Sequence, residues 1–430
     1  LLPQPVAGKH TWCRMSMERP PYLAERPSFT LDPWLHAGGY YVQEASSMFL
    51  EQALRQWAPL EEPLKVLDLC AAPGGKSTHL LSLLSAESVL VSNEIIRSRS
   101  KVLAENLSKW GTDQAIVTSL DPQQFERLPE AFDVVVVDAP CSGEGLMRRD
   151  AAAMQEWSES HVQLCSERQR RILMDVWPSL KPGGLLIYST CTFNAQENEA
   201  NLAWLHTQVE GESLSLDVPT AWGIQELQQD GQIGYGLYPH KLSGEGLFLA
   251  GIRKSGEQTV GKRGKKRKKQ KDNLTRLGKG KLAQITSWLK DWERKQAFQH
   301  QDQWRLLPEL GFPILEQLVQ EKLSIVSAGL HVATEKGKDL RPEQALATYP
   351  GLEAAAFATQ SLNREEAIAY LRRETMNLPA QKGWNLLEYQ SLGLGWAKVL
   401  PNRVNNYYPQ PWRIRMSGDS SWSLADLLAR

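Results

Sequence analysis

Short apolar segments that alternate with helix-like stretches constrain the fold of this chain more than any other feature. The strand candidates are residues 64–69, 88–93, 114–117, 133–138 and 184–189, and 247–252 closes the series. One helix is predicted to start near Lys76. Another carries Val102, Leu103, Leu107 and Trp110 on one face and ends at Gly111, and a long helical stretch covers 158–180. This alternation is typical of an α/β fold with a doubly wound parallel sheet.

The chain of 430 residues is long enough for two to four domains. The expected units are an extended entry arm (1–45), the unit with the strand–helix alternation (46–254), a basic linker (255–279), a small α+β middle domain (280–349) and a small α+β or barrel-like domain (350–430). In the middle domain, one helix is expected to carry Trp288 and Trp292. In the last domain, we expect a strand over 354–359, a helix opening at Asn363 and a hairpin through 393–395.

Composition excludes several classes of protein. The formal net charge is zero, so the chain as a whole carries no basic signal for nucleic acid. Five cysteines without a CxxC pair argue against a disulfide framework and a zinc site, and no metal site is expected. The cysteines fit a reducing cytosol, and no stretch is long and apolar enough to span a membrane. The residues from Leu1 onward show no signal-peptide pattern. The chain begins with Leu and not with Met, so we expect an N-terminal piece to be missing.

A glycine-rich turn between the first strand and the next helix has the context of a nucleotide-cofactor loop. It follows Asp68 and consists of Cys70, Ala71, Ala72, Pro73, Gly74, Gly75 and Lys76. Its glycines let the backbone approach a ligand, and the helix start offers free N–H groups. The loop matches neither GxxxxGK[ST] nor GxGxxG, so an adenosine without a required phosphate, as in S-adenosylmethionine, fits better than NAD. The alternative is a plain tight turn.

Two acidic residues lie where such a cofactor needs them. Glu94 ends the second strand, where an acid usually accepts both ribose hydroxyls, and Asp121 follows the third strand, where it can meet an adenine amino group. Strand context and acid spacing together favour cofactor binding over a surface glutamate.

Two cysteines stand just beyond predicted strands, flanked by Ser, Thr and Gly. Cys141 comes three residues after Asp138, and Cys191 lies between two threonines. Open α/β sheets bind ligands in the crevice at the strand carboxyl ends, so both thiols are expected there. A thiolate that adds to carbon-6 of cytosine makes carbon-5 nucleophilic toward a methyl sulfonium. The carboxyl of Asp138 is placed to hydrogen-bond the ring N3.

The remaining cysteines have a simpler interpretation. A lone cysteine is usually a small buried hydrophobe, and we apply this to Cys13 and Cys165, and mostly to Cys70.

The stretches 41–48, 70–76, 93–94, 138–145 and 188–192 together resemble the Sun-type family of RNA (cytosine-5) methyltransferases, and within it the branch that acts on bacterial ribosomal RNA. Residues 402–409 are similar, more weakly, to the PUA-like tail of that branch. The resemblance implies a Rossmann-like S-adenosylmethionine-dependent methyltransferase core followed by a C-terminal α+β/PUA-like domain. Residues 1–45 would then be the remainder of an N-terminal RNA-binding region.

The resemblance also implies roles for the site residues. S-adenosylmethionine would be held by residues 70–76, Glu94, Asp121 and Asp138. In this family the Thr-Cys-Thr cysteine attacks the base, which assigns the nucleophile to Cys191. Cys141 would then assist breakdown of the covalent adduct, with Asp138 beside the base.

The expected activity is therefore 5-methylcytosine formation in RNA, with small-subunit (16S) ribosomal RNA as the expected substrate. The expected partner is structured RNA, such as the small ribosomal subunit, with no membrane, and the protein is expected to be a cytoplasmic monomer. The alternatives are the same reaction on tRNA and a catalytically silent RNA-binding or assembly factor. An NAD-dependent oxidoreductase is a distant third.

Several basic segments are candidates for RNA contacts. Residues 262–271 hold eight basic residues in ten and are either a phosphate-neutralising arm, a solvated linker or a nuclear address. Arg148 and Arg149 could hold phosphates near the target base, and Lys398, Arg403 and Tyr407 could form an RNA face. Taken singly, each of these residues is more often ordinary surface. The target base is expected to leave its stack to reach the thiols.

Overall fold

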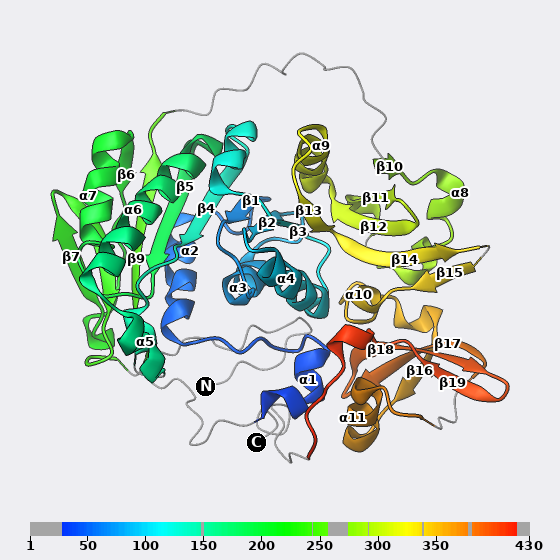
Figure 1. Ribbon diagram of the computed structural model, residues 1–430. Helices are drawn as coiled ribbons and strands as arrows, with labels where there is room; N and C mark the ends of the chain where they lie inside the picture. The colour runs from blue at the N-terminus through cyan, green and yellow to red at the C-terminus, as the bar shows by residue number, and fades with distance from the viewer. Residues whose placement is uncertain are drawn as a thin grey trace.

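The computed structural model describes residues 28–147, 150–242, 244–256, 274–290, 292–337, 339–376 and 381–418. Within them, a large mixed sheet has the strand order β13-β3-β2-β1-β4-β5-β9-β8-β7, with β6 paired to β9 (Figure 1). Its strands are β1 (Lys65–Asp68), β2 (Val89–Asn93), β3 (Ala115–Thr118), β4 (Phe132–Asp138), β5 (Leu180–Thr190), β6 (Gly211–Ser213), β7 (Gln225–Gln229), β8 (Gln232–Leu237), β9 (Leu247–Lys254) and β13 (Ile325–Ala328). Strands β1 to β5 are mutually parallel, which confirms the predicted doubly wound arrangement.

The sheet is buried on both faces because its central strands are apolar at nearly every position. Successive residues alternate between two cores: Leu67 belongs to one and Val66 to the other. One core is covered by α2 (Leu50–Trp57), α3 (Gly75–Leu83) and α4 (Arg97–Trp110). The other is covered by α6 (Glu159–Val176), α7 (Glu199–Gln208) and α9 (Phe312–Gln320). The strand carboxyl ends are left free between these two layers, where a site can form.

Local predictions for this sheet mostly agree with the structure. Gly111 ends α4 with φ +65°, as its position predicted. Val102 was wrongly placed on the buried face of that helix, since it is 46% exposed. The β7–β8 hairpin was not predicted because its alternate residues, from Gln225 to Gln229, are polar and give no apolar period.

The end of the expected entry arm is not extended where the structure describes it. Residues Phe29–Leu31 form a 3₁₀ turn, and α1 (Pro33–His36) follows, opened by Asp32, whose side chain accepts from Trp34 N. Leu31 and Ala37 pack into the core of the C-terminal unit, beside α11. The described part of the arm therefore packs against the C-terminal unit.

A second sheet has the order β10-β11-β12-β14-β15. Its strands are β10 (Leu274–Arg276), β11 (Lys295–His300), β12 (Gln303–Pro308), β14 (Leu330–Lys336) and β15 (Asp339–Pro342). This part of the chain is not separate from the large sheet, as a middle domain would be. Its strand β13 pairs with β3, and its helix α9 packs in the core of the large sheet. The helix expected around Trp288 and Trp292 was wrong. Between short α8 (Lys279–Leu282) and β11, Trp288 ends the 3₁₀ turn Thr286–Trp288 and Trp292 begins the 3₁₀ turn Trp292–Arg294. Leu289, which lies between the two tryptophans, is extended and forms a β-bridge with Leu352, so no continuous helix carries both.

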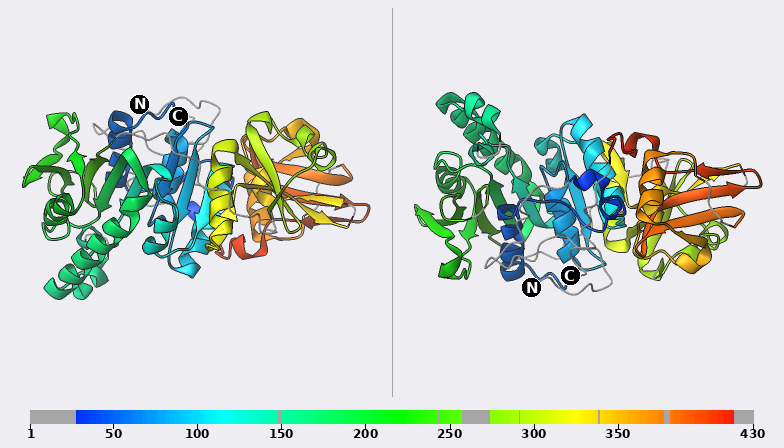
Figure 2. Two further views of the ribbon diagram at one scale, coloured as in Figure 1. Left: turned by 90° about the horizontal axis from the view of Figure 1, so that it is seen from above. Right: turned by 90° about the horizontal axis from the view of Figure 1, so that it is seen from below.

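The C-terminal sheet has the order β16-β17-β18-β19. It consists of β16 (Ala358–Ser361), β17 (Gly383–Tyr389), β18 (Leu392–Leu400) and β19 (Arg403–Asn406), with α10 (Gln344–Ala347) before it and α11 (Arg364–Arg372) across it. The helix start at Asn363 is confirmed as a capping box with Glu366. The hairpin is confirmed too, but its turn lies at Gln390 and Ser391, where φ is positive, and not at 393–395. The second and third sheets lie together at one end of the molecule (Figure 2).

Candidate active site

The glycine-rich loop lies between β1 and α3. Gly74 has φ +117° and starts the helix at Gly75, so a side chain here would be strained. Helix α4 holds the loop from the side: Arg99 Nη2 donates to Ala72 O at 2.8 Å and Asn106 Nδ2 donates to Pro73 O at 2.8 Å. The loop is thus fixed in place, with the N-terminus of α3 open toward the strand ends.

A polar network joins the ends of the first three strands. The buried Asn93 donates to Leu69 O and Leu120 O at 3.1 and 3.0 Å, and its Oδ1 accepts from Thr118 Oγ1 at 2.8 Å. Asp68 is fully buried, with one oxygen bonded to Ser77 Oγ at 2.7 Å. Its second oxygen, Oδ1, has no hydrogen-bond partner among the described residues. Burial above all, together with the charge of Asp138, raises the pKa of Asp68 to about 7 despite the bond from Ser77.

The two acids expected to meet an adenosine lie at the same edge. Glu94 is nearly buried at the end of β2, where Oε1 accepts from Ile96 N at 2.9 Å and Oε2 lies 3.3 Å from Arg99 Nη1. Asp121 is more exposed and caps the 3₁₀ turn Pro122–Arg127 by accepting from Gln123 N at 3.1 Å. Both carboxylates therefore have local partners, and their cofactor contacts stay predictions.

Lys76 links the loop to the fourth strand. Its Nζ lies 2.8 Å from Asp138 Oδ2, while Asp138 Oδ1 accepts from Ser189 Oγ at 2.9 Å. Burial alone would lower the pKa of Lys76, but the charge and hydrogen bond of Asp138 raise it above its ordinary value. The ammonium group thus stays charged in a nearly buried place.

The two predicted cysteines are brought into direct contact. Cys141 and Cys191 have their sulfur atoms 3.1 Å apart, and both are free thiols. Their strands β4 and β5 are neighbours, with Asp138 opposite Ser189. Gly145 N donates to Cys191 O at 2.7 Å, and a Cβ at Gly145 would lie 2.8 Å from that oxygen, so only glycine fits there.

The surroundings shift the pKa values of the two thiols in opposite directions. A hydrogen bond from Cys141 lowers the pKa of Cys191 against the effect of its burial, and the charge of Lys76 lowers it further. The same hydrogen bond and burial raise the pKa of Cys141 well above its ordinary value, and the charge of Glu197 adds to the rise. Cys191 is therefore the thiol that ionises more readily, with Cys141 as donor.

The other described cysteines take no part in this pair. Cys165 is buried on α6, as predicted for a structural cysteine. Cys70 is half-buried in the loop, and burial, with the charge of Asp138, raises its pKa. Cys13 lies outside the described residues. No group of three or more His, Cys, Asp or Glu suited to a metal ion occurs in the described part of the chain.

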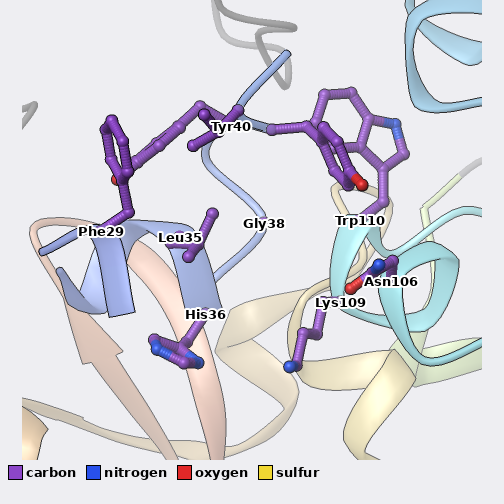
Figure 3. A pocket seen from close by; sticks show the side chains of 10 residues that line it. Phe29, Leu35, His36, Gly38, Tyr40, Asn106, Lys109 and Trp110 are labelled. Atoms are coloured by element: carbon purple, nitrogen blue, oxygen red, sulfur yellow. The ribbon is translucent and has the colours of Figure 1, made fainter. Parts of the chain in front are cut away.

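A separate cavity of about 280 Å³ lies where the segment before α2 passes α4 (Figure 3). Phe29 and His36 line one side of it, and Asn106, Lys109 and Trp110, all on α4, line the other. Neither cysteine lines it and no loop residue from 70 to 76 does, so it is not part of the reaction centre.

Of the residues predicted to contact RNA, three lie in the C-terminal unit and the others lie outside the described residues. Lys398 Nζ lies 5.1 Å from the ring centre of Trp384, and Tyr407 meets the same ring edge to face at 4.5 Å. The sequence analysis missed Trp384, although it stands opposite Lys398 in the β17–β18 pair. Arg403 lies at the start of β19, away from this contact. Arg148, Arg149 and 262–271 lie outside the described residues.

Sequence reasoning also missed the polar residues behind the cysteines. Glu197 is fully buried and Asn198 is 2% exposed. The signal was present as a run of Asn and Glu after Cys191, an unusual composition for residues that turn out to be buried.

Comparison with known proteins gives consistent matches. A family model described as 16S rRNA methyltransferase RsmB/F matches residues 56–253, and a model described as the methyltransferase RsmF PUA domain matches residues 357–414. "Ribosomal RNA small subunit methyltransferase F" of Erwinia tasmaniensis is 32% identical over 87% of this chain and 78% of its own length. The protein of the same name from Vibrio parahaemolyticus is 32% identical over 87% and 79%.

Two further matches cover about half of this chain. The protein of the same name from Pectobacterium atrosepticum is 40% identical, over 51% of this chain and 45% of its own length. Among solved structures, NSun6 from Pyrococcus horikoshii with SFG is 26% identical over 55% of this chain and 57% of that chain, with a TM-score of 0.46.

Proposed function

Because this chain belongs to the RsmB/F family of 16S rRNA methyltransferases, we propose that it forms 5-methylcytosine in small-subunit ribosomal RNA, with Cys191 as the nucleophile. The expected family, its fold class, the rRNA methyltransferase class and the cofactor S-adenosylmethionine are confirmed by these matches. A structure of the RNA-binding PUA type at the C-terminus is confirmed as well. The small-subunit target, the monomeric state and the cytoplasmic location stay predictions. No helix in the described residues has the length and apolarity needed to cross a membrane.

The loop and its neighbours suit S-adenosylmethionine. Asp68 Oδ1, buried and without a partner among the described residues, is an acceptor that a cofactor ammonium would satisfy. The N-terminus of α3 offers N–H groups for a carboxylate, with residues 70–76 around it. Glu94 would accept from the ribose, and Asp121 from the adenine amino group. When bound, the cofactor supplies an electrophilic methyl group.

The observation that carries the proposal is the contact of the two thiols at 3.1 Å beside the Lys76–Asp138 pair. The Cys191 thiolate adds to carbon-6 of cytosine, and the electron pair of the ring double bond becomes available at carbon-5 for methyl transfer. A water molecule then takes the proton from carbon-5, and the electrons of that C–H bond re-form the double bond and expel the thiolate. Cys141, which stays protonated, is placed to assist this release.

The Lys76–Asp138 pair lies beside Cys191 and suits the polar edge of the base. We assign to Asp138 a hydrogen bond with the ring, and Lys76 balances its charge at 2.8 Å. Because Lys76 also favours the Cys191 thiolate, the same ammonium group supports the nucleophile and the base-binding carboxylate.

Tritium transfer from labelled cofactor tests the proposal, with naked small-subunit rRNA, assembled small subunits and tRNA as separate substrates. Bisulfite sequencing then identifies the cytosine. Label in small-subunit rRNA, lost in Cys191→Ala, is the expected result. Label in tRNA alone would favour the same reaction on tRNA, and no label in any RNA would favour the silent factor.

A further inference from the structure

Two consecutive residues hold the segments around both cysteines. Asn198 Oδ1 accepts from Thr190 Oγ1 at 2.6 Å, and its Nδ2 donates to Thr192 O at 3.0 Å, so it grips both neighbours of Cys191. Glu197 Oε2 accepts from Ser142 N at 3.0 Å, on the other cysteine's loop. Residues 197 and 198 thus fix the segments of both thiols from one point in the chain.

Glu197 differs from its neighbour in carrying a buried charge. Its carboxylate is fully buried and accepts from Gln169 Nε2 at 2.7 Å and Asn194 Nδ2 at 2.8 Å, besides Ser142 N. No Lys, Arg or His forms an ion pair with it among the described residues. A buried carboxylate without a cation is costly, and hydrogen bonds alone compensate it here.

The same network reaches the other side of Cys141. Gln169 Nε2 also donates to Pro140 O at 3.0 Å, and Gln169 Oε1 accepts from Tyr188 Oη at 3.0 Å and Asn201 Nδ2 at 2.8 Å. These contacts fix the orientation of the Gln169 side-chain amide, so its Nε2 donor faces Glu197. The donors around residue 197 therefore require a hydrogen-bond acceptor there.

The charged groups around the two sulfurs are arranged asymmetrically. Lys76 and Asp138 act on Cys191, with Lys76 favouring its thiolate and Asp138 opposing it. Glu197 acts on Cys141 and opposes its ionisation. Two further titratable groups complete the surroundings: Tyr188, which stays protonated, and Glu144, which is hydrogen-bonded to Phe193 N at 2.7 Å.

We propose that Glu197 is a positioning residue: its buried carboxylate accepts from the amide that follows Cys141, so it fixes the Cys141 loop and places a negative charge on the Cys141 side of the sulfur pair, which leaves Cys191 as the attacking member. This inference rests on the proposed function for its consequence, namely which sulfur attacks and which remains a donor. The ionisation order itself needs neither RNA nor cofactor.

The test is therefore made on the thiols of the intact chain. The reduced protein is treated briefly with iodoacetamide across a pH series, and first-hit labelling at each cysteine is read by peptide mass spectrometry. In the wild type we expect Cys191 to react at lower pH, roughly tenfold faster than Cys141 near neutrality, since one pKa unit changes the thiolate fraction about tenfold. In Glu197→Gln the preference should shrink or vanish.

Three variants separate the effect of the charge from the effect of its position. Glu199→Gln makes the same chemical change two residues away, and Asn198→Ala removes hydrogen bonds on the Cys191 side without changing charge; both should keep the labelling order. Glu197→Asp keeps the charge and should keep it too, even if Glu197→Gln fails to fold. Preferential labelling of Cys141 in the wild type, or an unchanged preference in folded Glu197→Gln, would overturn the proposal. Absence of methylation by the wild type, with the Cys191 preference present in it and lost in Glu197→Gln, would instead count against the proposed function alone.

Discussion

Lys76 Nζ lies 2.8 Å from Asp138 Oδ2, so a residue of the cofactor loop is ion-paired with the strand end that leads to Cys141. Strands β1 and β4 are direct neighbours in the sheet, which brings these two side chains together across the crevice. The pair joins a residue of the proposed cofactor loop and the carboxylate assigned to the base in one contact.

Lys76→Met should slow methyl transfer and shift its pH dependence. The charge of Lys76 helps to lower the pKa of Cys191, so its removal raises that pKa and the rate should rise at higher pH than in the wild type. The thiolate fraction near neutrality falls when this pKa rises, so the loss of rate should be large near neutral pH and shrink as the pH increases. Single-turnover rates across pH measure this. Lys65→Met, at the opposite end of β1, is the control, and an unshifted profile in Lys76→Met would contradict the assignment.

Cys191→Ala should abolish methyl transfer while cofactor binding survives. Cys191 lies just beyond β5, and Gly145 N donates to its carbonyl and not to its side chain, so the substitution leaves this backbone hydrogen bond in place. Tritium transfer and calorimetric binding are measured side by side. Cys165→Ala, on α6, controls for the loss of a thiol. Activity near that of the wild type would remove Cys191 as the nucleophile.

Glu94→Ala should weaken cofactor binding by about 1–3 kcal/mol, the usual cost when a charged hydrogen-bonding partner is lost. Part of this effect passes through the loop, because Glu94 also holds Ile96 N and Arg99. Titration calorimetry with S-adenosylhomocysteine gives the value. Glu105→Ala removes a carboxylate paired with Lys109 elsewhere on helix α4 and should leave affinity unchanged. Equal affinities in both variants would place the ribose contact on another residue.

Trp384→Ala should weaken RNA binding by roughly 1–3 kcal/mol if bases stack on the ring that lies between Lys398 and Tyr407. Fluorescence anisotropy with a small-subunit rRNA fragment at one fixed salt concentration measures it. Trp222→Ala, a half-buried tryptophan of the catalytic unit, is the matched control. An equal loss of RNA affinity in the two variants, with equal thermal stability, would mean that Trp384 has no specific part in RNA binding.

The sequence was most informative where one local pattern determines one structure. The apolar strands, the loop after Asp68 and the strand-end cysteines all follow from short-range patterns, so their places in the sheet could be predicted. The β13–β3 pairing joins residues about 200 positions apart, and no local pattern records such a partner. Glu197 escaped prediction for a related reason: its acceptor role depends on Gln169 from α6 and Ser142 from the β4 loop, which meet only in the folded chain.

Cys141→Ala gives the sharpest test of the division of labour between the two thiols. The Cys141 thiol stays protonated 3.1 Å from Cys191, where it can donate a hydrogen bond as the attacking sulfur departs. Without it, addition to carbon-6 and methyl transfer should proceed while release is slow, so a covalent protein–RNA species should accumulate and survive denaturing gel electrophoresis. Cys191→Ala and the double variant should show none, because the attacking thiolate is absent. An adduct in Cys191→Ala alone would mean that the two cysteines exchange roles, and an adduct in neither single variant would leave Cys141 without a part in release.

Glu197→Gln extends this test to the residue behind Cys141. If the buried charge keeps Cys141 protonated, this variant should also accumulate adduct, more slowly than Cys141→Ala, whereas Glu199→Gln should not.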